Sequence, residues 1–430
     1  MVSTALLTDH YELTMLQATL ADGTAERRSV FEVFGRRFHG GRRFGVVAGT
    51  GRVLDALADF RFDPAEIEFL RSARVVDEAT CDWLADYRFT GDIWGYPEGE
   101  LWFPGSPVLR IDSTFGEGVI LETLILSILN HDSAIASAAA RMTLAAGDRP
   151  CIEMGTRRTH EEAAVASARA AYICGFAATS NLEAGRRYAI PTAGTAAHAF
   201  TLVHDTERDA FASQVASLGA ETTLLVDTYD TPQGVATAIE VGGATLGGVR
   251  LDSGDLGDVA RTTRAQLDAA GNTDTKITVT SDLDEYAIAA LAAAPVDGYG
   301  VGTSLVTGSG SPTSGFVYKL VARESSDGTM LGVAKKSKDK ASVGGRKTAL
   351  RRLNHKGVAE AEVIGIDITP RDDGDDRELM VPLVEQGKRV HDATLHDARE
   401  RLQASLGELP AAARRLSKGD PAIPTIFEEG

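Results

Sequence analysis

The chain has 430 residues, about three times the ~150 residues of a typical domain, so two or three domains or one large barrel with an appended domain are expected. Its composition, 43% hydrophobic and 24% charged, is ordinary for a folded protein and argues against long disordered tracts. The net charge of −17 repels nucleic acid and anionic lipid, which argues against both as partners and favours small-molecule chemistry.

The first 120 residues predict an α+β layer. Short apolar runs among turn residues read as strands at 31–34, 44–47, 92–96 and 107–111. The N-terminus lacks the basic flank and apolar core of a signal peptide, so a cytoplasmic protein is expected.

The longest apolar stretch, 119–146, predicts a buried helix. Charged residues such as Asp132 and Arg141 interrupt it too often for a membrane span. Cys81, Cys151 and Cys174 show no paired spacing, which fits buried thiols in a reducing compartment and indicates neither disulfides nor a zinc site.

From 151 to about 320, short apolar runs alternate with alanine-rich helical patterns. Strands are predicted at 151–154, 188–191, 223–226, 248–251, 277–280 and 296–301, and helices at 161–174, 205–218, 234–241, 255–270 and 282–293. Repeated strand and helix units predict a parallel sheet flanked by helices. We expect this sheet to close into a barrel, although the periodicity alone also fits an open doubly wound sheet.

Polar and glycine residues cluster directly after these strands. The clusters are 155–158, 192–195, 227–230, 252–255, 281–282 and 302–304. Because the carboxyl ends of parallel strands carry the active site in such folds, the six loops are expected to form one composite pocket.

Two of these loops suit a phosphorylated sugar. Arg250 could hold a phosphate while Asp252 takes ribose hydroxyls or a magnesium-bound water. The alternative is a solvated turn with Ser253 or Asp255 as helix cap. The turn Gly302-Thr303 could present backbone N–H groups to a phosphate, or be only a turn.

Three further positions allow more than one interpretation. His198 could be a general base, a covalent phosphate acceptor or a core histidine. Arg157 and Arg158 could meet an anion or form surface ion pairs. Tyr11 could stack on a planar ligand or be a half-buried tyrosine.

A basic segment, 335–352, stands out in this acidic chain. ATP or pyrophosphate binding and an ordinary solvated hairpin are both open. A polar, acidic stretch and a C-terminal helix follow it.

Taken together, these motifs resemble the nicotinate phosphoribosyltransferases. The resemblance runs in order through 8–14, 31–34, Glu153-Met-Gly-Thr-Arg-Arg158, 179–181, 194–198, 227–230, 250–255, 300–303 and 335–347. It implies a type II phosphoribosyltransferase fold, an irregular α/β barrel with an N-terminal α/β domain. The implied domains are 1–125, a catalytic barrel 126–330, and 331–430, which packs on the N-terminal domain.

The family's activity is the ATP-coupled transfer of ribose 5-phosphate from phosphoribosyl pyrophosphate to nicotinic acid in NAD salvage. For the base, the resemblance implies Asp9, Tyr11, Met154, Arg157, Thr179 and Ser180, with Tyr11 stacking on the pyridine and Arg157 pairing with the carboxylate. In the related nicotinamide-specific enzyme, the residue that resembles Ser180 in position is an aspartate. A neutral Ser180 therefore points to nicotinic acid.

For phosphoribosyl pyrophosphate the resemblance implies Arg157, Asp227, Arg250, Asp252, Ser253, Gly254, Gly302 and Thr303. Arg250, Asp252 and His198 would be catalytic, and His198 would be phosphorylated by ATP. Magnesium would be held through the substrate, with Asp227 and Asp252 ordering its waters. Lys335, Lys340 and Lys347 would lie near ATP or pyrophosphate. A homodimer with sites at the interface is implied, Tyr11 being lent to the neighbouring pocket.

The sequence departs from the family pattern at two positions, and three alternative functions stay open. Met154 stands where a phenylalanine is common, and Gly344 replaces a proline. The same fold could act on nicotinamide or on quinolinate, although we see no extra basic residue for quinolinate's second carboxylate. A non-catalytic nucleotide-binding barrel is the third alternative.

Overall fold

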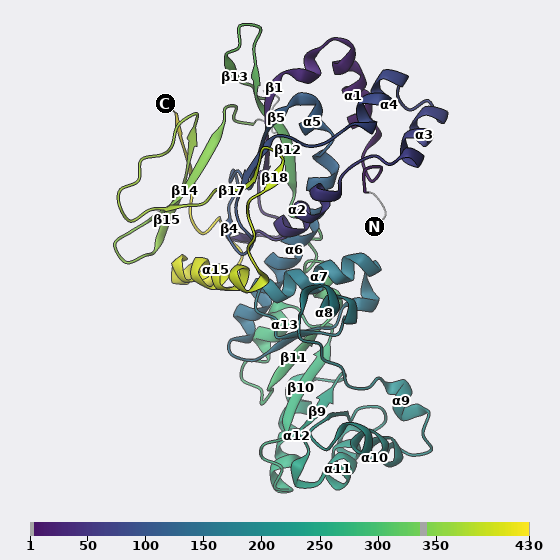
Figure 1. The fold of residues 1–430 in the computed structure, drawn as a ribbon. Helices are drawn as coiled ribbons and strands as arrows, with labels where there is room; N and C mark the ends of the chain where they lie inside the picture. Colours follow the sequence, from purple (N-terminus) through teal and green to yellow (C-terminus); the bar gives the residue numbers. More distant parts are fainter. Residues whose placement is uncertain (1–3, 336–341, 430) are drawn as a thin grey trace. The chain divides into compact units, whose positions relative to one another are not determined.

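The computed structural model describes residues 4–335 and 342–429, which form two compact units (Figure 1). Unit 1 comprises Met1–Ser137 and Ser311–Gly430, and unit 2 is Ala138–Gly310. These boundaries differ from the expected ones after residues 125 and 330. The observed boundary between Ser137 and Ala138 falls inside helix α6 (Glu122–Ala146), which starts in unit 1 and continues into unit 2.

Unit 1 is built around a seven-stranded sheet in the order β13-β12-β1-β5-β3-β17-β18. Its strands are β1 (Arg28–Gly35), β3 (Asp92–Gly95), β5 (Leu109–Thr114), β12 (Phe316–Glu324), β13 (Met330–Gly332), β17 (Val381–Glu385) and β18 (Lys388–Arg389). Strand β1 pairs antiparallel with β5 on one side and with β12 on the other. The two ends of the chain therefore share one sheet.

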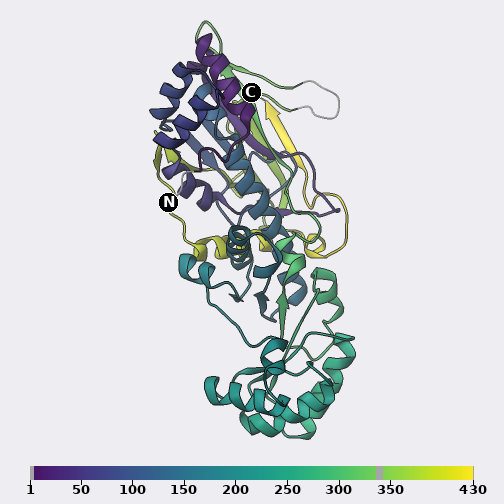
Figure 2. The same cartoon turned by 90° about the vertical axis from the view of Figure 1, so that its right-hand side faces the viewer.

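Helices and two smaller sheets complete unit 1. The helices are α1 (His10–Ala21), α2 (Thr50–Asp59), α3 (Pro64–Ser72), α4 (Glu78–Ala85), α5 (Phe115–Val119) and α15 (Leu395–Glu408). The smaller sheets contain β16 (Arg377–Glu378), β14 (Lys347–Leu353), β15 (Ala359–Ile366) and β19 (Thr425–Glu429), and separately β2 (Gly45–Val46) and β4 (Leu101–Trp102). Figures 1 and 2 show α1, α3 and α4 on one side of the large sheet and β14 and β15 on the other.

Helix α6 is the expected buried helix. The continuous stretch Phe115–Ala146 is long and apolar enough, by length and composition, to cross a membrane. However, 61% of its most apolar window is buried inside the protein, and the carboxylate of Asp132 within it accepts hydrogen bonds from Arg52 at 2.8 and 3.0 Å. A buried, paired charge of this kind is typical of a core helix.

Unit 2 is the predicted parallel α/β layer. Its sheet runs β7-β6-β11-β10-β9-β8, all parallel. The strands are β6 (Cys151–Glu153), β7 (Ala178–Thr179), β8 (Thr223–Leu225), β9 (Gly248–Leu251), β10 (Lys276–Ser281) and β11 (Gly298–Val301). The helices are α7 (Glu161–Ile173), α8 (Leu182–Tyr188), α9 (His198–Leu202), α10 (Glu207–Leu218), α11 (Thr231–Gly242), α12 (Leu256–Ala269), α13 (Glu285–Ala290) and α14 (Thr303–Val306). The sheet curls into a half-barrel, as expected for the irregular barrel class, but it does not close as we expected, because β7 and β8 remain its edges among the described residues.

One predicted strand of unit 2 is wrong. The run 188–191 overlaps the end of α8, whose start is capped by the Asn181 side chain accepting from the Ala184 N–H at 2.8 Å. Ala189, with φ of 54°, then ends the helix. Only the residues just beyond it pair with the sheet, where Thr179 bonds to the backbone of Pro191 and Ala193. The run 188–191 therefore contains the end of a helix and not a strand.

Candidate active site

A cavity of about 470 Å³ lies at the carboxyl ends of the unit 2 strands. Its lining includes Met154, Arg157, Arg158, Ser180, Thr195, His198, Arg250, Asp252, Thr280, Asp282, Gly302 and Thr303. Five of the six predicted polar loops contribute to this wall, and the sixth, 227–230, does not. Residues spread over 150 positions in sequence thus meet because parallel strands end at one edge.

The loop after β6 presents two arginines. Gly155 donates its N–H to the Glu153 carboxylate, and a 3-10 turn, Thr156–Arg158, follows. Arg157 and Arg158 are exposed on the cavity wall. Met154 lies over the neighbouring strand, since a Cβ on Gly300 would be 2.6 Å from its sulfur. The methionine therefore occupies the wall between the arginines and β11.

Arg250, at the end of β9, is a partly desolvated cation. Its Nη1 donates to the Thr195 hydroxyl at 2.6 Å, and its Nε is buried without a hydrogen-bond partner among the described residues. Burial lowers the pKa of Arg250, against the opposing charges of Asp252 and Asp227, and Arg157 adds to the lowering. A second nearby guanidinium and an unused donor suit an anionic ligand.

Asp252 links the strand ends to the histidine. Its Oδ2 lies 3.9 Å from His198 Nε2, and its Oδ1 accepts a hydrogen bond from Thr280. The other ring nitrogen of His198 lies 3.2 Å from the Thr228 hydroxyl. This arrangement holds the ring by hydrogen bonding at one nitrogen and leaves the other facing a carboxylate.

Asp227 supports Asp252 from the adjoining loop. Its Oδ2 accepts from the Asp252 N–H at 2.9 Å and from the Ser253 hydroxyl at 2.7 Å. Its Oδ1 is buried without a hydrogen-bond partner in the described part of the chain. An unused carboxylate oxygen beside a second carboxylate is the hard-oxygen chemistry that magnesium or its waters bind. The residues therefore fit the metal that the resemblance implies.

Some expected residues lie away from this wall. Thr179 is fully buried behind it, and Ser253 and Gly254 belong to the following turn. Asp9 and Tyr11 belong to unit 1, where Tyr11 is 45% exposed and its hydroxyl is hydrogen-bonded to Glu122. Burial, and then the charge of Glu122, raise the pKa of Tyr11 well above its usual value.

The basic segment is divided. Lys335 is exposed in unit 1, and Lys340 lies outside the described residues. Lys347 is 1% exposed, and its ammonium contacts the Glu32 carboxylate at 2.7 Å. This buried ion pair favours a structural role for Lys347 over the phosphate contact expected from the sequence.

Sequence reasoning gave no role to the threonines that serve the site. Thr195, Thr228 and Thr280 contact Arg250, His198 and Asp252 respectively. Thr195 and Thr280 stand at predicted strand ends, so their position was a usable signal, but a hydroxyl's partner depends on the register of neighbouring strands.

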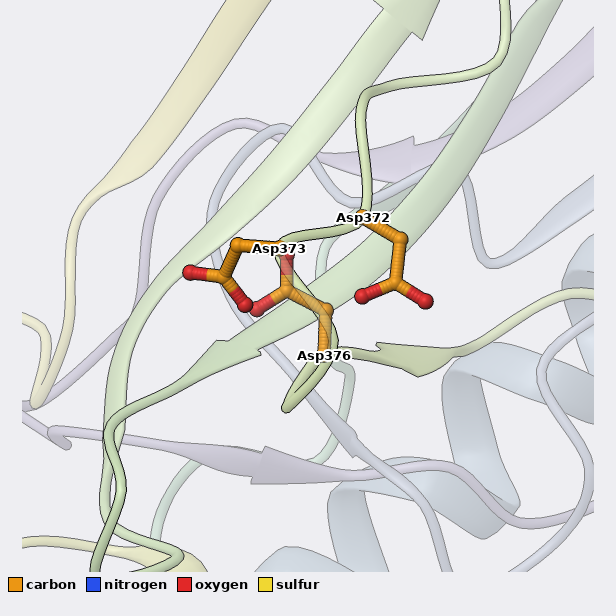
Figure 3. Close-up of side chains that lie close together, drawn as sticks. All are labelled: Asp372, Asp373 and Asp376. Atoms are coloured by element: carbon orange, nitrogen blue, oxygen red, sulfur yellow. The ribbon is translucent and has the colours of Figure 1, made fainter.

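A different acidic group, Asp372, Asp373 and Asp376, lies on one loop of unit 1 (Figure 3). Its ligand-type oxygens are within 4.8 Å of one another. Asp376 is already engaged by the Arg352 Nε at 3.3 Å and by the Leu353 N–H at 3.2 Å. The cluster is therefore explained by loop structure.

Comparison with known proteins identifies the family of the chain. The sequence-family model of the nicotinate phosphoribosyltransferase N-terminal domain matches residues 6–130 of this chain. A nicotinate phosphoribosyltransferase of Mycobacterium tuberculosis is 56% identical, covering 98% of this chain and 94% of that protein. One from Bacillus subtilis is 39% identical, covering 82% and 74%.

Solved structures give the same result. Human nicotinic acid phosphoribosyltransferase superimposes with a TM-score of 0.82 at 25% identity, covering 98% of this chain and 97% of that one. A nicotinate-nucleotide pyrophosphorylase from Pyrococcus furiosus, at 23% identity and a TM-score of 0.77, shares the fold, with coverage of 94% and 95%. By its full-length similarity, this chain belongs to the nicotinate phosphoribosyltransferase family.

Proposed function

We propose that the chain transfers ribose 5-phosphate from phosphoribosyl pyrophosphate to nicotinic acid, with coupled ATP hydrolysis, in NAD salvage. The bond from ribose C1 to the pyrophosphate oxygen breaks, and pyrophosphate leaves with the electron pair. The pyridine nitrogen donates its lone pair to C1, giving nicotinate mononucleotide. The observation that carries this proposal is the cavity that joins Arg157, Arg250, Asp252 and His198.

Arg250 and the Gly302-Thr303 turn are assigned to the 5-phosphate. The unused, buried Nε of Arg250 supports this assignment, because an anion would satisfy it. Arg157 contributes further positive charge at the same wall. Since little covalent chemistry falls to the protein, positioning and charge stabilisation supply the rate enhancement.

Asp252 is assigned to the ribose hydroxyls, and Asp227 fixes it through the Asp252 N–H. Magnesium, when bound, neutralises charge on the departing pyrophosphate. Asp252 and the unused Oδ1 of Asp227 are the groups that would order its waters. Ser253 and Gly254 would complete the turn around the ribose.

His198 is assigned as the phosphate acceptor from ATP. With the proton on Nδ1 and donated to Thr228, Nε2 keeps a lone pair that can attack the γ-phosphorus while ADP leaves. Hydrolysis of the phosphohistidine then favours mononucleotide formation. Lys335 and Lys340 remain candidates for ATP or pyrophosphate contacts.

The base end of the pocket is assigned to Arg157, Ser180 and Met154 from unit 2. Arg157 pairs with the nicotinate carboxylate, and neutral Ser180 tolerates that charge. Asp9 and Tyr11 are assigned to the same end, supplied across a homodimer interface. The exposed ring of Tyr11 supports this assignment, since it is available for stacking on a pyridine.

A direct assay separates this function from its rivals. The purified protein is given phosphoribosyl pyrophosphate and magnesium with nicotinic acid or nicotinamide, each with and without ATP, and mononucleotide is measured. We expect mononucleotide to form from nicotinic acid but not from nicotinamide, and we expect ATP to increase its amount. Product from nicotinamide would contradict the assignment of Ser180. Failure with both bases would instead support a non-catalytic nucleotide-binding barrel.

A further inference from the structure

A carboxylate with no access to solvent lies directly behind the cavity wall. Glu153, at the carboxyl end of β6, is 0% exposed and does not line the cavity. One of its oxygens accepts from the Gly155 N–H, and the other accepts from the Thr179 hydroxyl. The two donors belong to different loops, so a single side chain joins them.

The connection between these loops has further bonds. Ser180 donates its N–H to the Glu153 carbonyl at 2.8 Å. The Asn181 N–H donates to the Thr179 hydroxyl at 2.9 Å, and the Asn181 amide donates to the Thr156 hydroxyl at 3.2 Å. The first and the last of these bonds join the segment that carries Arg157 to the segment that carries Ser180, and the Asn181–Thr179 bond holds the second segment in shape. Arg157 and Ser180 are the two residues assigned to the nicotinate carboxylate.

Stability alone does not call for a carboxylate at this position. A buried acid is costly unless hydrogen bonds satisfy it, and an apolar side chain would avoid the cost. Burial raises the pKa of Glu153, against the opposing hydrogen bonds from Thr179 and Gly155. The Glu153 carboxyl group meets a hydrogen-bond partner at each of its two oxygens, which an apolar residue cannot do.

The loop has little freedom to move by another route. A Cβ on Gly155 would lie 2.2 Å from Val306 and 3.1 Å from a Glu153 oxygen, so the backbone here is in close contact on both sides. Moving the Glu153 carboxylate would therefore move Gly155, and with it Arg157 two residues on.

We infer that Glu153 is a positioning residue that fixes Arg157 relative to Ser180 and so sets selectivity for a pyridine bearing a carboxylate. This inference rests on the proposed function of the site. Thr179 acts with Glu153 as the second half of the same connection, and its buried hydroxyl serves the base through Ser180.

The test compares Glu153→Gln, Thr179→Val and the double variant. Each single change is expected to raise the KM for nicotinic acid about tenfold, because it removes one hydrogen bond that helps to hold Arg157 in place. The KM for phosphoribosyl pyrophosphate should rise clearly less, because Arg250, which makes neither bond, is the main phosphate contact and Arg157 only adds charge there. The double variant should be no worse than the worse single variant, because both changes break one connection.

Thr275→Val is the matched control. Thr275 is also buried, and its hydroxyl donates to the Leu246 carbonyl at 2.8 Å, but it lies at the amino end of β10, opposite the cavity. The substitution Thr275→Val, like Thr179→Val, removes one buried threonine hydroxyl beside this sheet, and it should leave both KM values unchanged. Thermal unfolding of all variants separates loss of positioning from loss of folding.

A second measurement does not depend on turnover. Amide hydrogen exchange in 155–158 should increase in Thr179→Val and stay at the wild-type level in Thr275→Val. Equal rises in both KM values, multiplying effects in the double variant, or unchanged exchange in 155–158 would each overturn the inference. An inactive wild type with the expected exchange result would overturn the proposed function while leaving the connection between the loops established.

Discussion

His198 Nε2 lies 3.9 Å from Asp252 Oδ2, and the opposite ring nitrogen lies 3.2 Å from the Thr228 hydroxyl. The imidazole is thus held at its far side while one nitrogen faces the strand end that carries Asp252. A phosphate acceptor requires this combination of a fixed ring and an accessible nitrogen.

Replacing His198 with alanine should abolish ATP stimulation and phosphate labelling of the protein from γ-labelled ATP. Transfer without ATP should persist, because the groups assigned to phosphoribosyl pyrophosphate remain. His204→Ala is the control, since the His204 side chain contacts the Phe200 carbonyl and ring beside α9 and does not line the cavity. Full ATP stimulation in His198→Ala would rule out the phosphohistidine.

Arg250→Lys should raise the KM for phosphoribosyl pyrophosphate by roughly 10- to 100-fold, because lysine lacks the planar fork of donors that binds phosphate. The KM for nicotinic acid should change far less. Arg264→Lys provides the comparison, since Arg264 also makes several hydrogen bonds, to Asp268 and to two carbonyls, but on α12 outside the cavity. Equal effects of the two substitutions on initial rates would contradict the phosphate role.

Ser180→Asp should lower kcat/KM for nicotinic acid by at least about tenfold, because two like charges would face each other near the base. The value for nicotinamide, which carries no charge, should not fall in parallel. Ser180→Ala, which removes the hydroxyl without adding charge, should preserve the preference for nicotinic acid. A parallel fall for both bases would place Ser180 away from the carboxylate.

Complementation between two chains that each lack ATP-stimulated turnover tests the shared site. Tyr11→Ala and His198→Ala proteins are unfolded, mixed and refolded together, and ATP-stimulated turnover is measured. If Tyr11 serves the partner's pocket, one intact site forms in each mixed dimer, and roughly a quarter of wild-type turnover should return by the symmetry of a twofold dimer. No recovery from a mixture shown to contain mixed dimers would place Tyr11 in its own chain's pocket.

Acid should destabilise unit 1 through Asp132. Burial alone would raise the pKa of Asp132, but the hydrogen bond from His131 and the charge of Arg52 outweigh it and hold the pKa below its usual value. Its ionised form therefore stabilises the fold above the unfolded pKa of about 3.9, and that contribution is lost as the pH falls through the lower folded value.

The measurement is urea unfolding at pH 7 and near pH 3. Asp132→Asn should cost about 3 kcal/mol at neutral pH, because Arg52 loses its partner, and its stability should fall less than that of wild type on acidification. Asp82→Asn, an exposed change on α4, should follow the wild-type curve. Identical acid sensitivity of wild type and Asp132→Asn would refute the assignment.

The sequence predicted the unit 2 layer well because its strands are buried and its helices are apolar on one face. Runs such as 223–226 and 248–251 correspond to β8 and β9. β7 escaped prediction because it has only two residues. Strands β14 to β18 were hidden in polar sequence, where pairing with distant partners, and not local periodicity, decides the structure.

The site was predictable as far as strand ends are predictable. His198, Arg250 and Asp252 reach one cavity because each lies at the end of a parallel strand or in the segment beyond it. The buried connection through Glu153 was not predictable from pattern, since a carboxylate at a strand end reads as exposed. Lys347 shows the opposite case, a lysine in a basic run that folding places against Glu32.

The discontinuity of unit 1 has a consequence for synthesis on the ribosome. Strand β1 is complete within the first 35 residues, but its neighbour β12 starts at Phe316. Until that point emerges, one edge of β1 has unpaired N–H and C=O groups that can pair with other nascent chains. Unit 2 is continuous in sequence and can fold first. Premature termination after residue 310 should therefore yield a folded unit 2 carrying an aggregation-prone N-terminal sheet.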